Sequence, residues 1–236
     1  MPIRHHAVLA ATLAWAASPV HAATVFDVHL NSAQEVAPAG QQNVSAKGFG
    51  RAQIVARGGA LELAYDVVFD RDFDFAPILG DPSFPFVLPS GDAGDVGART
   101  GLEVTRLHIH EGARGQNGPV AYGIVNPGSE IDRDAVVDSL LGAFRVSGGW
   151  DAAEGTPGRT FADFADLLLS LKEGEDAPLY FNLHTANDPA GAIRGQLVAA
   201  NDAMAPLAPV PVPAAFSLLG FGLVGLAAVR RRRAKT

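Results

Sequence analysis

Residues 102–112 read LEVTRLHIHEG, and apolar and polar side chains alternate through the second half of this stretch. Successive side chains of a β-strand point to opposite faces, so residues two apart share a face. Leu107 and Ile109 are therefore expected to enter a core, while His108 and His110 project together from the other face. The stretch is predicted to be a half-buried strand that carries two imidazoles side by side.

Six further segments show the same alternation and are also predicted to be strands. They are residues 24–31, 48–57, 61–69, 120–126, 179–185 and 192–199. The dipeptide Gly58-Gly59 separates two of them and is typical of a hairpin turn. Seven or more short strands divided by turns predict a mainly β domain over residues 23–201. We expect an antiparallel β-sandwich or barrel of immunoglobulin-like or superoxide-dismutase-like architecture.

One or two short helices are expected to interrupt the strands. Thr160 and Asp163 are placed as an N-cap and its partner three residues later. Apolar residues then recur at helical spacing, and Gly174 is suited to end the helix. Residues 132–141 are predicted to form a shorter helix. Both helices are expected to pack against a sheet.

Residues 70–100 form an insert rich in aspartate and proline. Its start resembles the first half of a calcium loop, with alternating carboxylates at Asp70, Asp72 and Asp74. However, Phe75 stands where such a loop requires glycine, and Asp81 replaces the closing glutamate. We therefore favour an edge strand, with Phe73 and Phe75 inward and the aspartates outward, over a calcium site.

The composition excludes several classes of site. The 236 residues include no cysteine, so disulfides, thiolate metal sites and a cysteine nucleophile are excluded. All 25 acidic residues lie between Asp27 and Asp202, a region with only 12 of the 18 basic residues. A surface this acidic repels phosphate backbones, so no nucleic-acid partner is expected. No phosphate-binding glycine loop or Gly-x-Ser-x-Gly motif is present.

Residues 1–22 have the three parts of a secretory signal peptide. A basic start precedes the apolar run 7–17, and small or branched residues follow at Val20 and Ala22. Cleavage is predicted between Ala22 and Ala23, and the domain is expected to be exported from the cytoplasm.

The C-terminal end is predicted to carry a second sorting signal. Residues 202–213 form a proline-rich linker, 214–229 an uncharged apolar run, and 230–236 a basic tail. At 1.5 Å per residue the apolar run reaches about 24 Å, which is a short but feasible span of a bilayer core of about 30 Å. Four basic residues should stop transfer and stay cytoplasmic, namely Arg230, Arg231, Arg232 and Arg233.

This tail resembles the PEP-CTERM sorting signal of Gram-negative bacteria. The resemblance rests on the apolar helix, the arginine cluster and the preceding motif Val210-Pro211-Val212-Pro213. Val212 replaces the usual glutamate, so the motif is closer to the Val-Pro-Leu-Pro-Ala variants. The resemblance implies an exosortase-type partner, anchoring in the inner membrane before processing, and then display at the cell surface or in the extracellular matrix.

Six short motifs occur in the order found in one known module. They are LNSAQEVAP (30–38), HIHEG (108–112), GQNGPV (115–120), GW (149–150), YFNLHT (180–185) and IRGQL (193–197). In this combination, residues 24–199 resemble the chordin-type (CHRD) domain. The resemblance implies a β-rich extracellular module and gives no reaction. The insert near residues 70–99 is longer than the family usually has.

Three histidines are candidate metal ligands. On strands, His108 and His110 share a face, and His184 of a neighbouring strand would complete a three-nitrogen site for copper or zinc. Glu111 is a candidate fourth ligand or a hydrogen-bond acceptor that orients an imidazole. The His-x-His-Glu strand also resembles the copper-binding strand of copper–zinc superoxide dismutases. Those enzymes use more histidines, so a mononuclear site fits better than dismutase activity.

A structural role for these histidines is the alternative. His108 and His110 would then bond Asn182, Glu111 or backbone carbonyls and hold residues 112–118 against the sheet. Three functions follow. The first is a surface-sorted, non-enzymatic binding or extracellular-matrix module, the second a metal-binding protein with redox or hydrolytic chemistry, and the third a purely structural component of the cell surface or biofilm. We favour the first from the sequence, because both ends are sorting signals and no catalytic pattern is present.

Overall fold

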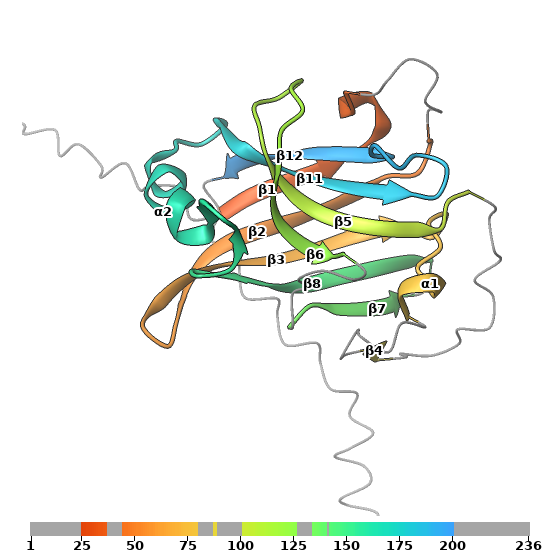
Figure 1. Ribbon diagram of the computed structural model, residues 1–236, viewed down its shortest axis with the longest axis horizontal. Coiled ribbons are helices and arrows are strands. Elements are labelled where there is room, and N and C mark those ends of the chain that lie inside the picture. Colours follow the sequence, from red (N-terminus) through yellow and green to blue (C-terminus); the bar gives the residue numbers. More distant parts are fainter. Residues whose placement is uncertain are drawn as a thin grey trace, which may run out of the picture.

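The chain folds around one curled, mainly antiparallel β-sheet that forms a half-barrel (Figure 1). The computed structural model describes residues 25–36, 44–79, 87–88, 101–126, 134–140 and 142–200. The predicted cleavage site at Ala22 and Ala23, the linker, the apolar run and the basic tail lie outside these residues.

The order of strands in the sheet is β4-β7-β8-β3-β2-β1-β12-β11-β5-β6. Nine of these strands pair antiparallel, and the two-residue β4 joins one edge in parallel with β7. Their bounds are β1 Val25–Leu30, β2 Gly48–Arg57, β3 Ala60–Asp70, β4 Val87–Leu88, β5 Val104–Glu111, β6 Val120–Val125, β7 Val136–Leu140, β8 Ala143–Asp151, β11 Asp176–Thr185 and β12 Ile193–Ala200. A separate hairpin is formed by β9 Gly155–Thr156 and β10 Arg159–Thr160.

The sheet confirms the expected antiparallel β class and corrects its architecture. All seven predicted strands are present as β1, β2, β3, β5, β6, β11 and β12. They do not divide into two packed sheets, because β1 pairs with both β2 and β12 and so joins the two halves. The turn between β2 and β3 has positive φ at Gly58 and Gly59, as a tight hairpin requires.

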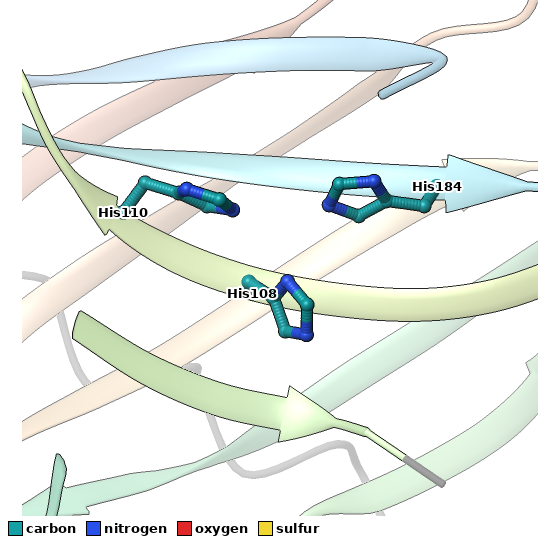
Figure 2. A group of neighbouring side chains, drawn as sticks. All are labelled: His108, His110 and His184. Atoms are coloured by element: carbon teal, nitrogen blue, oxygen red, sulfur yellow. The ribbon is translucent and has the colours of Figure 1, made fainter. Parts of the chain in front are cut away.

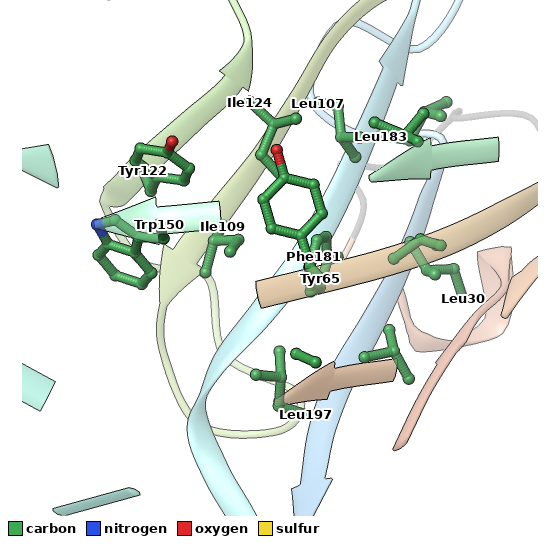
Figure 3. Packing of buried hydrophobic residues seen from close by; sticks show 14 of the residues in the cluster. Leu30, Tyr65, Leu107, Ile109, Tyr122, Ile124, Trp150, Phe181, Leu183 and Leu197 are labelled. Carbon is green, nitrogen blue, oxygen red and sulfur yellow. The ribbon is translucent and has the colours of Figure 1, made fainter. Parts of the chain in front are cut away.

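Aromatic side chains fill the space inside the curl. Tyr122 of β6 stacks on Trp150 of β8 with 5.2 Å between ring centroids, although these strands lie near opposite edges of the sheet. Tyr65 of β3 meets Phe181 of β11 edge-on at 6.0 Å, across three intervening strands. The sheet therefore closes on itself through side chains. Figure 3 shows these residues with Leu107 and Ile109, which lie in the core as the alternation of β5 predicts.

In the part of the chain that the structure describes, two short α-helices and a 3₁₀ helix, η1 (Ser32–Gln34), accompany the sheet. The predicted helix at Thr160 is α2 (Phe161–Ser170), with a capping box between Thr160 and Asp163. Its Phe161 and Phe164 pack against Trp150, so the helix covers the core where the curl closes. The other, α1 (Ala76–Leu79), is one turn long.

The prediction of a helix over residues 132–141 was wrong. The described part of this segment contains β7, which pairs with β8. Val137 is buried and Val136 and Asp138 are half-buried, which is the alternation of a strand. Adjacent β-branched residues favour a strand once a neighbouring strand is available to pair with them.

The start of the insert has the expected apolar pattern, but the predicted edge strand with outward aspartates was wrong. The segment forms a turn, an isolated bridge at Asp74 and the helix α1, and Asp74 is buried. Phe73 and Phe75 are fully buried. Asp70 accepts a hydrogen bond from the Lys47 amide and Asp74 accepts one from the Ala76 amide, so these two carboxylates serve the backbone. No helix among the described residues is long and apolar enough to cross a membrane.

Candidate metal centre

Three imidazoles converge on the face of the sheet opposite the core (Figure 2). His108 and His110 project from β5, and His184 projects from the adjacent strand β11. Ring centroids are 5.5 Å apart for His108 and His110, 5.1 Å for His108 and His184, and 5.9 Å for His110 and His184. One nitrogen from each ring lies within 4.8 Å of the others. The residues that the sequence singled out are therefore neighbours in space.

Backbone carbonyls fix the orientation of two of the rings. Nδ1 of His110 lies 2.9 Å from the Gly118 oxygen, and Nδ1 of His184 lies 3.1 Å from the Pro189 oxygen. A carbonyl oxygen only accepts, so each Nδ1 carries the proton and donates it. The neutral rings therefore keep an acceptor lone pair on Nε2, the form in which imidazole binds a metal.

Four buried ring nitrogens have no hydrogen-bond partner among the described residues. They are Nε2 of His110, Nε2 of His184 and both ring nitrogens of His108, and each of the three rings offers one ligand nitrogen to the group. A buried polar group without a partner costs about 1–3 kcal/mol, and several in one place need an explanation. A metal ion accepts exactly such lone pairs, so the donor set fits a transition metal such as copper or zinc.

Burial keeps all three rings neutral. Burial and the nearby His184 and His110 lower the pKa of His108 to about 3. Burial also lowers the pKa of His184 to about 4, partly offset by its bond to the Pro189 carbonyl. The pKa of His110 is lowered by burial and partly restored by its bond to Gly118. At neutral pH no proton has to leave before a metal binds.

Glu111 does not belong to this group. Its position next to His110 places its side chain on the other face of β5, where it accepts a hydrogen bond of 2.7 Å from Nε of Arg159. The exposed His29 also lies apart, as expected of the polar face of β1. Among the described residues, the three histidines are the only group of His, Cys, Asp or Glu that could hold a metal.

A loop at residues 112–118, which we call the β5–β6 loop, packs over the site. Its Gly118 carbonyl binds His110, and its Gly118 amide donates to the hydroxyl of Tyr180 at 3.1 Å. A Cβ at Gly118 would lie 1.6 Å from the Glu111 carbonyl oxygen, so only glycine fits here. Arg194 and Gln196 of β12 hold other carbonyls of the loop. The bond from His110 to the Gly118 carbonyl is of the kind expected from the structural alternative, whereas the contacts that Arg194 and Gln196 make with the loop carbonyls were not predicted.

A second buried polar cluster lies beside the histidines. Asn182, which is paired with His108 across β11 and β5, adjoins Glu35 and Gly191. A Cβ on Gly191 would lie 2.6 Å from both Asn182 Oδ1 and Glu35 Oε2. Burial raises the pKa of Glu35, while the Val36 amide and the Arg194 charge oppose the rise. Sequence reasoning assigned no role to Glu35, and its only signal was its place in a motif.

These features define a class of protein: an antiparallel half-barrel with a buried three-histidine group on its outer face. Among known protein families, the CHRD domain matches residues 26–197. The chain belongs to this family, and the resemblance carried by the sequence motifs is confirmed. No curated protein and no solved structure matches the chain.

Proposed function

We propose that this CHRD domain binds one transition-metal ion, copper or zinc, through His108, His110 and His184. One observation carries the proposal: buried nitrogens of all three rings converge within 4.8 Å and lack hydrogen-bond partners among the described residues. Neutral imidazoles suit copper and zinc, whereas calcium and magnesium prefer oxygen ligands. The metal would supply Lewis acidity or redox chemistry, and this chain's own residues would orient its ligands.

The test is a direct measurement of metal binding. The purified full chain is stripped with chelator, and its metal content and thermal unfolding are measured with and without added Cu²⁺ or Zn²⁺. We expect one ion per chain and stabilisation of about 2.7 kcal/mol when free metal is a hundredfold above Kd. Replacing all three histidines by alanine should abolish both effects.

His29→Ala is the matched control, because His29 is an exposed imidazole of the same domain outside the group. It should bind metal like the parent chain. A parent chain without bound metal and without a chelator effect would remove the proposal. In that case the function left is the second candidate, a non-enzymatic binding or matrix module. The bonds of His110 and His184 to loop carbonyls support that candidate, because they serve a structural role equally well.

We also propose that the protein is exported, held in the inner membrane by residues 214–229, and sorted by an exosortase-type enzyme. The support lies in the sequence at both ends of the chain. The signal peptide precedes the domain, and the motif at residues 210–213 with the arginine cluster follows it. The domain would then act at the cell surface or in the extracellular matrix.

A further inference from the structure

Arg194 of β12 is the most unusual buried residue near the histidines. It is 1% exposed. Its Nη1 donates to the Gln116 oxygen at 2.7 Å, and its Nη2 donates to the Ala113 oxygen at 2.8 Å and to Gln196 Oε1 at 3.1 Å. A buried guanidinium is costly unless its donors find partners, and two of these three bonds go to carbonyls of one loop. Arg194 therefore ties the β5–β6 loop to β12.

Arg194 also belongs to a stack that ends at a histidine of the site. Its Cζ lies 3.4 Å from the centroid of the Tyr180 ring. Tyr180 in turn stacks on His110, with 5.1 Å between centroids and 16° between planes. Because β11 lies between β12 and β5, Tyr180 separates Arg194 from His110. Cation–π and stacking contacts thus hold the plane of the His110 ring.

The loop and the stack meet at Gly118. Its amide donates to the Tyr180 hydroxyl, and its carbonyl accepts the Nδ1 proton of His110. The first bond fixes the position of Gly118, and the second selects the tautomer that leaves Nε2 of His110 open. By contrast, His184 is oriented by Pro189, which lies in a different loop.

We propose that Arg194 is a positioning residue of the metal centre: it holds the β5–β6 loop so that Gly118 keeps the Nε2 of His110 directed at the metal. This role rests on the proposed function. Partners that orient a metal-binding histidine are typically worth a 10–100-fold change in metal affinity. A lysine keeps the charge of Arg194 but cannot make the paired bonds to Ala113 and Gln116.

The test uses Arg194→Lys in the full chain loaded with Cu²⁺ or Co²⁺. We expect Kd to rise by about 10–100-fold, together with a shift of the visible ligand-field bands at saturating metal. Arg145→Lys is the control, because Arg145 pairs with Asp66 through two hydrogen bonds on β8 and β3. Arg145→Lys breaks a two-bond arginine pair that lies away from the β5–β6 loop, and it should leave the Kd and the spectrum unchanged.

A double-mutant cycle separates positioning from general destabilisation. With His110→Ala, Arg194 and the β5–β6 loop have no ligand left to orient, so adding Arg194→Lys should cause no further loss of Cu²⁺ affinity. With His184→Ala, adding Arg194→Lys should still cause the full loss. Equal losses in both backgrounds, or an unchanged spectrum in Arg194→Lys, would overturn the role.

Tyr180→Phe replaces Arg194→Lys in every measurement if the latter does not fold. It keeps the ring stack and removes only the hydroxyl that accepts the Gly118 amide, so a smaller rise in Kd of a few fold is expected, again absent with His110→Ala. If the parent chain binds no metal, the proposed function is wrong. If the parent chain and the Arg194→Lys chain bind metal equally well, only the positioning role of Arg194 is wrong.

Discussion

His108 illustrates a conflict between stability and binding within one side chain. Among the described residues neither of its buried nitrogens makes a hydrogen bond of good geometry, and the neighbouring Asn126 offsets only part of the lowering of its pKa. In the metal-free chain such a group is a cost that an apolar side chain would not incur. His108 is therefore expected to be retained for a ligand.

This conflict gives the first prediction. His108→Leu should leave the unfolding free energy of the metal-free chain unchanged or raise it by about 1–3 kcal/mol, because buried unpaired nitrogens are removed at similar volume. The same change should abolish stabilisation by Cu²⁺ or Zn²⁺. Urea unfolding with and without metal measures both. Leu107→Ala, on the core face of the same strand, should cost about 2–5 kcal/mol in either condition.

The second prediction concerns pH in the metal-free chain. The unfolded chain binds protons at histidine below a pKa of about 6.5, whereas folded His108 and His184 bind them only near 3 and 4. Between these limits the unfolded state holds more protons, so stability rises with pH and falls on acidification. The maximal slope is about 1.4 kcal/mol per pH unit for each histidine.

Urea unfolding between pH 7 and pH 4, with chelator present, measures this slope. The parent chain should lose stability steadily below about pH 6.5. His108→Leu should lose it less steeply, since one of the depressed groups is absent. If the unfolding free energies of the two chains fall in parallel with pH, proton uptake by His108 does not contribute to the loss of stability.

The sequence predicted those parts of the site that follow from side-chain alternation along a strand, and it missed those that depend on the path of a loop. The alternation of side chains along one strand was enough to place His108 and His110 on the same face. The alternation along the neighbouring strand made His184 the third candidate. The contacts of Arg194 depend on where the loop at 112–118 folds back, and period-two alternation carries no information about that. Glu111 does not join the histidines because it lies two residues after Ile109 and therefore shares a face of β5 with the core side chains.

Sequence signals predicted the structure best where a side chain bonds to backbone groups close to it in the chain. At α2, the side chains of Thr160 and Asp163 form the capping box that the sequence predicted. Thr160→Ala should therefore lower the unfolding free energy by about 1 kcal/mol. Thermal unfolding measures the change, and Thr160→Ser, which keeps the hydroxyl, should recover most of it. An unchanged stability in Thr160→Ala would mean that packing of Phe161 and Phe164 holds the helix without its cap.

Elements that depend on partners far along the chain were missed. β8 contains Gly148 and Gly149, which are typical of loops, yet it pairs with β3 over nine residues. The strand forms because its Val146 and Trp150 enter the core between neighbours on both sides. Tertiary pairing thus overrides weak intrinsic propensity, and the same effect turned the predicted helix at β7 into a strand.

At the scale of the whole domain, Trp150 joins the two sides of the curled sheet through its contacts in the core. It stacks on Tyr122 of the far edge and packs against both aromatic residues of α2. Trp150→Ala should lower the unfolding free energy by about 3–5 kcal/mol and weaken the near-ultraviolet circular dichroism. Phe49→Ala, at a side chain that is 57% exposed, should change stability by no more than about 0.5 kcal/mol. Similar losses in both variants would place the core elsewhere.

The last prediction tests the proposal that the protein is exported and that its C-terminal residues, and not the domain, hold it at the cell. Deleting residues 210–236 removes the proposed sorting motif, the apolar run and the arginine cluster, while all the described strands end by Ala200. The truncated protein should therefore fold and be released into the medium, because nothing is left to stop its transfer. Fractionation of cells and medium, followed by immunoblotting, measures the outcome. His108→Leu with an intact tail is the control and should stay with the cells, since its change lies in the metal site alone. Retention of the truncated chain on the cells would mean that the domain itself, and not its tail, holds the protein at the surface.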